Sequence, residues 1–246
     1  MNALILAAGR GSRMTQLTDD RPKCLVELHG RALLDWQLDA LRSAGIDQVA
    51  ILTGYRAGDV NTRADASFHN PRWQETNMVQ TLACAREWLC AAPCVVSYSD
   101  IVYPASAVES LLKAEAELAL TYDPKWLDLW SRRFEDPLDD AESFKLDAAG
   151  NLLEIGSRAD SCADIEGQFM GLLRFTPASW ARVETLLASL PPKRADRLDT
   201  TAMLNGLLRA GEVIEPVAID GPWGEADSAS DLAVLESLWP KTQGCA

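Results

Sequence analysis

The sequence predicts an α/β fold with a doubly wound, mostly parallel sheet and a small inserted lid. Apolar runs of strand length alternate with amphipathic runs of helix length through residues 1–122. The first apolar run ends in a glycine-rich turn, which is typical of ligand-binding loops at the edge of a parallel sheet. The alternation becomes irregular over residues 123–165 and then resumes, which indicates an insertion.

The first strand, helix and second strand form the clearest unit. Residues 3–8 are a continuous apolar run, the pattern of a strand buried on both faces. Residues 31–44 carry apolar side chains at roughly helical spacing and stop at Gly45, a residue type that often ends helices. Residues 48–53 are a second buried strand, so the three segments predict a βαβ unit with a right-handed crossover.

The rest of the chain continues this alternation in order. The expected helices cover residues 76–89, 105–113, 177–190, 200–210 and 228–239. The expected strands cover residues 94–98, 117–122, 168–175 and 213–219. Two short strands at 143–147 and 152–155 flank an Ala149-Gly150-Asn151 turn, which predicts a hairpin inside the insertion.

Composition excludes several classes of partner. The chain has 246 residues, 48% of them hydrophobic, and a net charge of −13. It is long enough for a full core and is expected to form one domain. The acidic surplus argues against nucleic acid or an anionic membrane as partner, because both need a basic face. Six cysteines without a C-x-x-C pair, and the absence of a signal peptide or membrane-spanning run, predict a soluble cytoplasmic protein with free thiols.

Cations and glycines gather between residues 9 and 23 of this acidic chain. Gly9 and Gly11 follow the first strand, where backbone N–H groups can approach a phosphate. Position 14 is Met14 rather than glycine and no Walker motif is present, so neither a dehydrogenase nor a P-loop NTPase is supported. Arg13 and Lys23 instead suit a polyphosphate whose charge is neutralised during transfer. A solvated surface loop is the alternative interpretation.

The stretch LAAGRGSRM…RPKCLVEL resembles the signature of the sugar-nucleotidyltransferase superfamily. Its members join a nucleoside triphosphate to a sugar phosphate or related phosphate ester and release pyrophosphate. The resemblance implies a Rossmann-like, glycosyltransferase-A-like fold with a nucleotide-binding core (1–122), an acceptor lid (123–165) and an acceptor-binding, closing part (166–246). It also implies that Arg13 and Lys23 are catalytic contacts to the phosphates. The residues implied to bind the nucleotide are Leu6, Ala7, Ala8, Gly9, Gly11, Ser12, Arg13 and Lys23.

Two aspartates are candidates for a metal site. Asp100 follows the strand at residues 94–98, at the sheet edge where the glycine loop is expected, and a polyphosphate normally travels with Mg²⁺. The resemblance implies that Asp100 and Asp227 hold Mg²⁺, with Mn²⁺ as an alternative. Either aspartate alone could instead be a turn residue or a helix N-cap. The attacking phosphate is largely dianionic near neutral pH and needs no general base, so His29 and His69 are expected to be structural.

The segment NMVQTL, residues 77–82, bears on the base and the acceptor. Sugar nucleotidyltransferases usually carry a glutamine-glycine-threonine-alanine-like stretch at this point. The segment is more similar to the bacterial phosphocholine and aminoethylphosphonate cytidylyltransferases, which implies CTP as the nucleotide. The resemblance also implies that Asn77, Gln80 and Thr81 contribute to the nucleotide pocket.

Eight tryptophans are many for a chain with five phenylalanines and four tyrosines. Tryptophan offers the best aromatic face for an ammonium group, and Trp126 and Trp130 would share a helix face at i and i+4. We therefore expect a small phosphate or phosphonate acceptor with a cationic amine, although tryptophans more often serve packing. The candidate acceptor-binding residues are Trp126, Trp130, Glu166, Gln168, Trp223 and Glu225.

Two alternative functions stay open from the sequence. One is a sugar-1-phosphate uridylyltransferase or guanylyltransferase. The other is a catalytically inactive nucleotide-binding regulator, against which the joint presence of Lys23, Asp100 and Asp227 argues. A homodimer is also open.

Overall fold

The computed structural model describes residues 1–11, 14 and 18–239. Its strands are β1 (Asn2–Ala7), β2 (Glu27–Leu28), β3 (Arg31–Ala32), β4 (Gln48–Thr53), β5 (Ala66–His69), β6 (Cys94–Tyr98), β7 (Ile101–Val102), β8 (Leu118–Asp123), β9 (Glu142–Leu146), β10 (Leu152–Arg158), β11 (Gln168–Phe175), β12 (Glu215–Ala218) and β13 (Gly224–Glu225). Its α-helices are α1 (Leu33–Ser43), α2 (Met78–Ala83), α3 (Arg86–Ala91), α4 (Ala105–Leu112), α5 (Trp126–Arg133), α6 (Pro177–Ser189), α7 (Pro192–Asp196), α8 (Thr200–Arg209) and α9 (Ala229–Leu238). Short 3₁₀ turns are η2 (Lys23–Leu25), η3 (Ala57–Asp59), η4 (Pro137–Asp139) and η5 (Cys162–Asp164).

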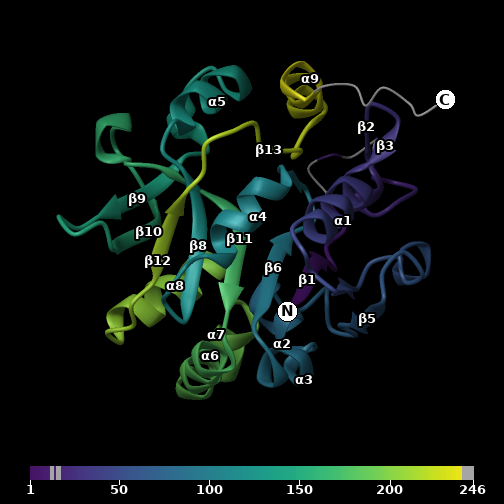
Figure 1. The fold of residues 1–246 in the computed structure, drawn as a ribbon, viewed down its shortest axis with the longest axis horizontal. Coiled ribbons are helices and arrows are strands. Elements are labelled where there is room, and N and C mark those ends of the chain that lie inside the picture. Colours follow the sequence, from purple (N-terminus) through teal and green to yellow (C-terminus); the bar gives the residue numbers. More distant parts are fainter. Residues whose placement is uncertain (12–13, 15–17, 240–246) are drawn as a thin grey trace.

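Seven strands form one sheet in the order β12-β8-β11-β6-β1-β4-β5 (Figure 1). Strand β11 runs antiparallel to β6 and β8, whereas the other neighbouring pairs are parallel. Helix α1 packs against α4, and α3 and α8 pack against α6, so two groups of helices cover the sheet. The predicted α/β fold with a mostly parallel sheet is confirmed.

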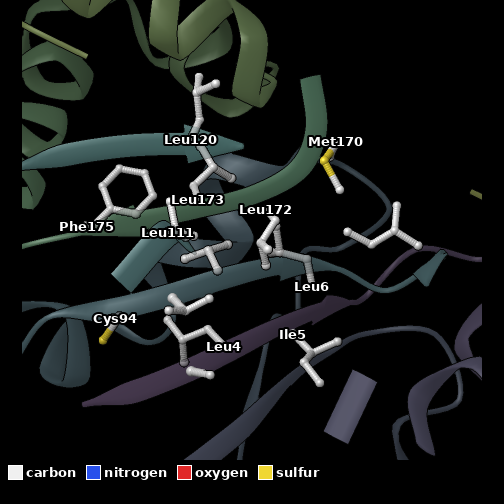
Figure 2. Packing of buried hydrophobic residues seen from close by; sticks show 14 of the residues in the cluster. Leu4, Ile5, Leu6, Cys94, Leu111, Leu120, Met170, Leu172, Leu173 and Phe175 are labelled. Atoms are coloured by element: carbon white, nitrogen blue, oxygen red, sulfur yellow. The ribbon is translucent and has the colours of Figure 1, made fainter. Parts of the chain in front are cut away.

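The middle of the sheet is the core of the molecule. Ala3, Leu4 and Ile5 of β1 are completely buried, because neighbouring strands and helices cover the strand on all sides. Figure 2 shows buried side chains from β1, β6, β8, β11 and α4 packed together. Burial of apolar surface stabilises by about 25 cal/mol per Å². This packing fixes the ends of β1 and β6 relative to each other.

Most elements lie where the pattern of apolar residues predicts them. Strands β4, β6 and β11 occupy the predicted residues. The helix expected over residues 76–89 is instead two short helices, α2 and α3, because the backbone of Ala85 (φ −99°, ψ 24°) leaves the helical region. Strand β5 was not predicted, since it lies at the sheet edge with alternating half-buried and exposed residues rather than an apolar run.

Residues 123–165 contain α5 and the predicted antiparallel hairpin of β9 and β10. Trp126, Phe144 and Ile155 from this segment belong to the same apolar cluster as the main sheet. Helix α8 packs against β10 and connects the hairpin to the rest of the molecule. The division of the chain into core, lid and closing part stays a prediction.

The two histidines and the described cysteines have the following surroundings. His29 Nε2 lies 2.9 Å from the carbonyl oxygen of Trp239, and His69 Nδ1 lies 3.3 Å from Thr53 Oγ1. The five cysteines in the described part of the chain are free thiols, as expected. No helix in that part is long and apolar enough to cross a membrane.

Candidate active site

The carboxyl ends of β1 and β6 meet at one edge of the sheet. The two strands are parallel neighbours, with Leu6 opposite Tyr98. Gly9 therefore leaves β1 beside the point where Asp100 leaves β6. Ligands of open parallel sheets bind outside the carboxyl ends of the strands, so the glycine loop and Asp100 lie where such a ligand would be held.

A short β-ladder brings Asp227 to the same place. Glu225 in β13 pairs with Ile101 in β7, and the N–H of Ala226 donates to the carbonyl oxygen of Asp100 at 2.9 Å. Asp227 therefore follows directly after a segment that is hydrogen-bonded to the Asp100 backbone. Two aspartates more than a hundred residues apart in the sequence are in this way fixed side by side.

The side chain of Lys23 joins the two aspartates. Its Nζ donates to Asp100 Oδ2 at 2.6 Å and also to Asp227 Oδ1. Burial lowers the pKa of Lys23, but the charges of the two carboxylates outweigh burial and raise it. Lys23 is therefore a fixed cation, with only 10% of its side chain exposed.

Gly11 adopts a left-handed backbone conformation, and its lack of a side chain leaves room for Lys23. Its φ of +69° is rare for residues with a side chain. A Cβ at this position would lie 2.9 Å from Cβ of Lys23, closer than such atoms approach. The glycine at position 11 is thus explained by the packing of Lys23 against the loop.

A cleft of about 440 Å³ opens over these residues. The structure brings together seven of the predicted site residues along its wall: Leu6, Gly9, Gly11, Lys23, Asn77, Asp100 and Asp227. Met78, Tyr98 and Ser99 also line the cleft and were not predicted. Met78 directly follows Asn77, and Tyr98 and Ser99 are the two residues before Asp100. The end of β6 and the start of α2 were therefore the signal that could have identified them.

The donor set at Asp100 and Asp227 fits a divalent cation bound together with a phosphate. Asp100 Oδ1 is buried and has no hydrogen-bond partner among the described residues, so it keeps the capacity to bind a further cation. No group of three or more candidate ligands occurs in the described part of the chain. Mg²⁺ usually takes only one or two carboxylates and completes its shell with phosphate oxygens and water.

The N-cap alternative for Asp227 is wrong. Ser228 caps α9 through its hydroxyl oxygen, which accepts from the N–H of Asp231, and Asp231 returns the contact in a capping box. The carboxylate of Asp227 instead points to Lys23.

A second cavity of about 400 Å³ adjoins the first, and the two share Asn77, Met78, Tyr98 and Asp227. Three of the predicted acceptor residues line it: Trp130, Gln168 and Glu225. Five carboxylates line it, whereas none of its described lining residues is a lysine or arginine: Asp140, Glu142, Asp199, Glu225 and Asp227. The cavity is therefore suited to a positively charged group.

These acids differ in how their charge is compensated. Burial raises the pKa of Glu225 to about 7, and Arg133 acts against this rise. The Arg133 guanidinium is 1% exposed and donates to Glu225 Oε1 at 2.7 Å and to Asp231 Oδ1 at 2.9 Å. The pKa of Glu142 is raised by burial and by the charges of Asp199 and Asp140.

The other predicted acceptor residues lie outside this cavity. Trp126 and Trp223 are each 3% exposed. Their indole N–H groups donate to Ile165 O at 3.2 Å and to Asp123 Oδ2 at 2.8 Å, so both rings pack in the protein interior. Glu166 is exposed and accepts from the N–H of Leu146 at 2.6 Å. Of the three tryptophans expected near the acceptor, Trp130 alone lines this cavity, together with the aromatic residues Tyr98 and Phe169.

The other described residues predicted to bind the nucleotide are not among those that line the first cavity. Thr81 is buried and its hydroxyl accepts from Asn70 Nδ2 at 2.9 Å, and Gln80 lines neither cavity. Ala7 and Ala8 are buried. Ser12 and Arg13, by contrast, fall outside the described residues.

Comparison with known proteins identifies the family of this chain. Residues 3–151 match the family model of the MobA-like NTP transferase domain. The CTP:phosphoglutamine cytidylyltransferase of Campylobacter jejuni is 37% identical over 95% of this chain and 98% of its own length. The choline-phosphate cytidylyltransferase of Haemophilus influenzae is 34% identical over 42% of this chain and 45% of its own.

A solved structure, the inositol-1-phosphate CTP transferase from T. maritima, has the same fold. Its TM-score is 0.79 at 19% identity, and the match covers 100% of this chain and 97% of that one. The fold and the family match agree with each other. The chain belongs to the MobA-like NTP transferase family and is a nucleotidyltransferase.

Proposed function

We propose that this protein transfers CMP from CTP to a small phospho-compound that carries a cationic amine, with release of pyrophosphate. One observation carries the proposal: the cleft that holds Lys23, Asp100 and Asp227 adjoins an acidic cavity, and Asp227 lines both. The triphosphate belongs in the first cavity, where the glycine loop and the lysine lie. The acceptor belongs in the second.

The reaction is an in-line displacement at the α-phosphorus of CTP. An oxygen of the acceptor phosphate forms a bond to this phosphorus, while the bond to the oxygen that bridges the α- and β-phosphates breaks, and pyrophosphate leaves. A phosphate monoester is largely dianionic near neutral pH, so no general base is needed. The structure offers positioning and charge, which are the main sources of catalysis for phosphoryl transfer.

Lys23 acts on the phosphates of the nucleotide. The ammonium group is fixed by Asp100 and Asp227 and faces the cleft beside Gly9 and Gly11. It opposes the negative charge that develops on the leaving pyrophosphate. Arg13 is proposed to assist Lys23 from the glycine loop.

Asp100 and Asp227 are the residues that would hold Mg²⁺, or Mn²⁺ in its place. The metal would supply further neutralisation of phosphate charge. Each carboxylate also keeps Lys23 in position, so these side chains have a task in the cleft apart from metal binding.

The choice of CTP and of an amine-bearing acceptor has separate support. The two relatives described above are both cytidylyltransferases, and phosphoglutamine and choline phosphate both contain a cationic nitrogen. The acid-rich cavity beside Asp227 suits such a group. A hexose phosphate would be expected to meet more amide and hydroxyl groups than this cavity presents.

A pyrophosphate-release assay tests the proposal. Each of the four common nucleoside triphosphates is combined with phosphoglutamine, phosphocholine, aminoethylphosphonate and hexose 1-phosphates. The expected result is fastest release with CTP and an amine-bearing acceptor. Faster release with UTP or GTP and a hexose 1-phosphate would instead support the sugar nucleotidyltransferase alternative.

A further inference from the structure

A third cavity, of about 640 Å³, lies beyond the acidic one. The two cavities share Glu142, Asp199 and Thr201. The wall of the third cavity is formed by parts of α6, α7, α8 and β10. It contains three arginines: Arg194, Arg197 and Arg209. Three cavities thus adjoin one another in succession: the first contains Lys23, Asp100 and Asp227, the second is acidic and the third contains arginines.

The three side chains are exposed, and no described residue forms a hydrogen bond or a salt bridge with their guanidinium groups. The charge of Arg197 does act on the neighbouring Asp196, whose carboxylate is hydrogen-bonded to Arg72. Arg72, by comparison, reaches the same short helix α7 and binds Asp196 through two hydrogen bonds, at 2.7 and 3.2 Å. These three arginines line one cavity without a hydrogen-bonded acid among the described residues, so their guanidinium donors are available to a ligand.

The arginines come from separate segments that face the same space. Arg209 lies on the face of α8 that also carries Asn205 and Ala202, one and two turns earlier. Arg194 lies in α7, and Arg197 follows directly after that helix. The fold therefore gathers planar donors that suit bidentate recognition of a carboxylate.

The order of charges along the three cavities defines the ligand. The acceptor phosphate must lie near Lys23 to react, so the rest of the acceptor extends into the acidic cavity. There Glu142 and Asp199 suit an ammonium group, and beyond them the arginines suit an anion. A phosphate followed by an ammonium and then by a carboxylate describes a phosphorylated amino acid.

We propose that Arg194, Arg197 and Arg209 form a carboxylate-binding subsite that selects phosphorylated amino acids over simple amine phosphates. The subsite rests on the proposed function, since it takes the acceptor to lie in the acidic cavity. It assigns specificity to residues that contact neither the nucleotide nor the reacting phosphorus.

Two pairs of probes isolate the carboxylate. O-phosphoserine and phosphoethanolamine differ by this group alone, and O-phosphohomoserine and 3-aminopropyl phosphate repeat the comparison with one more methylene. The kcat/KM of each acceptor is measured at saturating CTP, and its Kd is measured by calorimetry with a non-hydrolysable CTP analogue. The carboxylate-bearing member of at least one pair is expected to have a kcat/KM about tenfold or more higher, since a hydrogen bond to a charged group is commonly worth that factor.

The variant Arg194→Gln/Arg197→Gln/Arg209→Gln tests the residues. It should bring the ratio within each pair close to one, through a higher KM for the carboxylate-bearing acceptor, and leave the KM of CTP unchanged. A matched control removes the same charge elsewhere on the surface, through Lys113→Gln, Arg132→Gln and Lys193→Gln, which are exposed and do not line this cavity. The control should keep the ratio of the parent protein.

The outcomes separate the two proposals. Equal use and equal Kd within both pairs, while CMP transfer proceeds, would overturn the subsite and leave the proposed function standing. An unchanged ratio in the arginine variant would also overturn it. If no acceptor receives CMP, the proposed function fails, and the calorimetric preference for the carboxylate then decides the subsite by itself.

Discussion

Replacing Lys23 with alanine is expected to lower both turnover and stability. The side chain of Lys23 is 10% exposed, and it contacts two carboxylates whose side chains are 23% and 16% exposed. Removing the ammonium group leaves two carboxylates close together without the positive charge that compensates their mutual repulsion. Lys23→Ala should therefore affect the folded state even before substrate binds.

The structure sets the size of each effect. Breaking a buried ion pair by deleting one partner commonly costs about 3–5 kcal/mol. We expect the lower end, about 3 kcal/mol, because Asp100 and Asp227 both keep some contact with water. Loss of a donor that opposes transition-state charge costs a further 3–4 kcal/mol or so in the activation barrier, which lowers kcat by at least about two orders of magnitude.

Urea unfolding and steady-state kinetics measure the two effects separately. The control is Lys113→Ala, an exposed lysine at the end of α4, which should change neither quantity. The double variant Lys23→Ala/Asp100→Asn should recover part of the stability but none of the activity, since it removes one of the two uncompensated charges. A Lys23→Ala protein with the parent's kcat at saturating CTP would refute the role of the lysine.

Four further substitutions test separate parts of the site. Asp100→Asn and Asp227→Asn should each raise the Mg²⁺ concentration needed for half-maximal rate, and a parental titration curve would exclude that aspartate as a ligand. Gly11→Ala should lower kcat as Lys23→Ala does, because its Cβ would displace Lys23, and normal activity would show that the loop adapts. Glu142→Gln should raise the free energy of unfolding, measured by urea titration across pH. Burial and neighbouring carboxylates raise the pKa of Glu142, so its ionisation destabilises the fold as pH rises above the ordinary value of 4.5; equal stability of variant and parent at neutral pH would contradict this.

The sequence was sufficient for the parts of the site that follow directly from a strand. Buried strands have continuous apolar runs, and the ends of the segments at 48–53 and 94–98 were predicted to the residue. Asp100 could be assigned because it comes directly after one of these ends. Asp227 could be assigned only through the resemblance to the nucleotidyltransferase superfamily, since its position depends on pairing between β13 and β7, two strands of two residues each.

The acceptor side was harder to predict because it depends on which way each helix face turns. The i and i+4 spacing of Trp126 and Trp130 did place the two rings together, with centroids 6.1 Å apart. That face packs inward, however, because large apolar rings stabilise a fold most when buried. Of that pair only Trp130 lines the cavity, and much of the remaining wall consists of side chains such as Glu142 and Asp199, whose local sequence carries no pattern of a binding site.

The central claim, transfer of CMP to an amine-bearing acceptor, is tested most directly by following the α-phosphate of CTP. The protein is incubated with CTP labelled at the α-phosphorus, a divalent cation and the best acceptor of the screen. We predict that the label moves into a phosphatase-resistant product in which CMP is joined to the acceptor, with one pyrophosphate released per molecule formed. Binding of CTP without any transfer of label to any acceptor would contradict the account and identify a nucleotide-binding protein without catalytic activity.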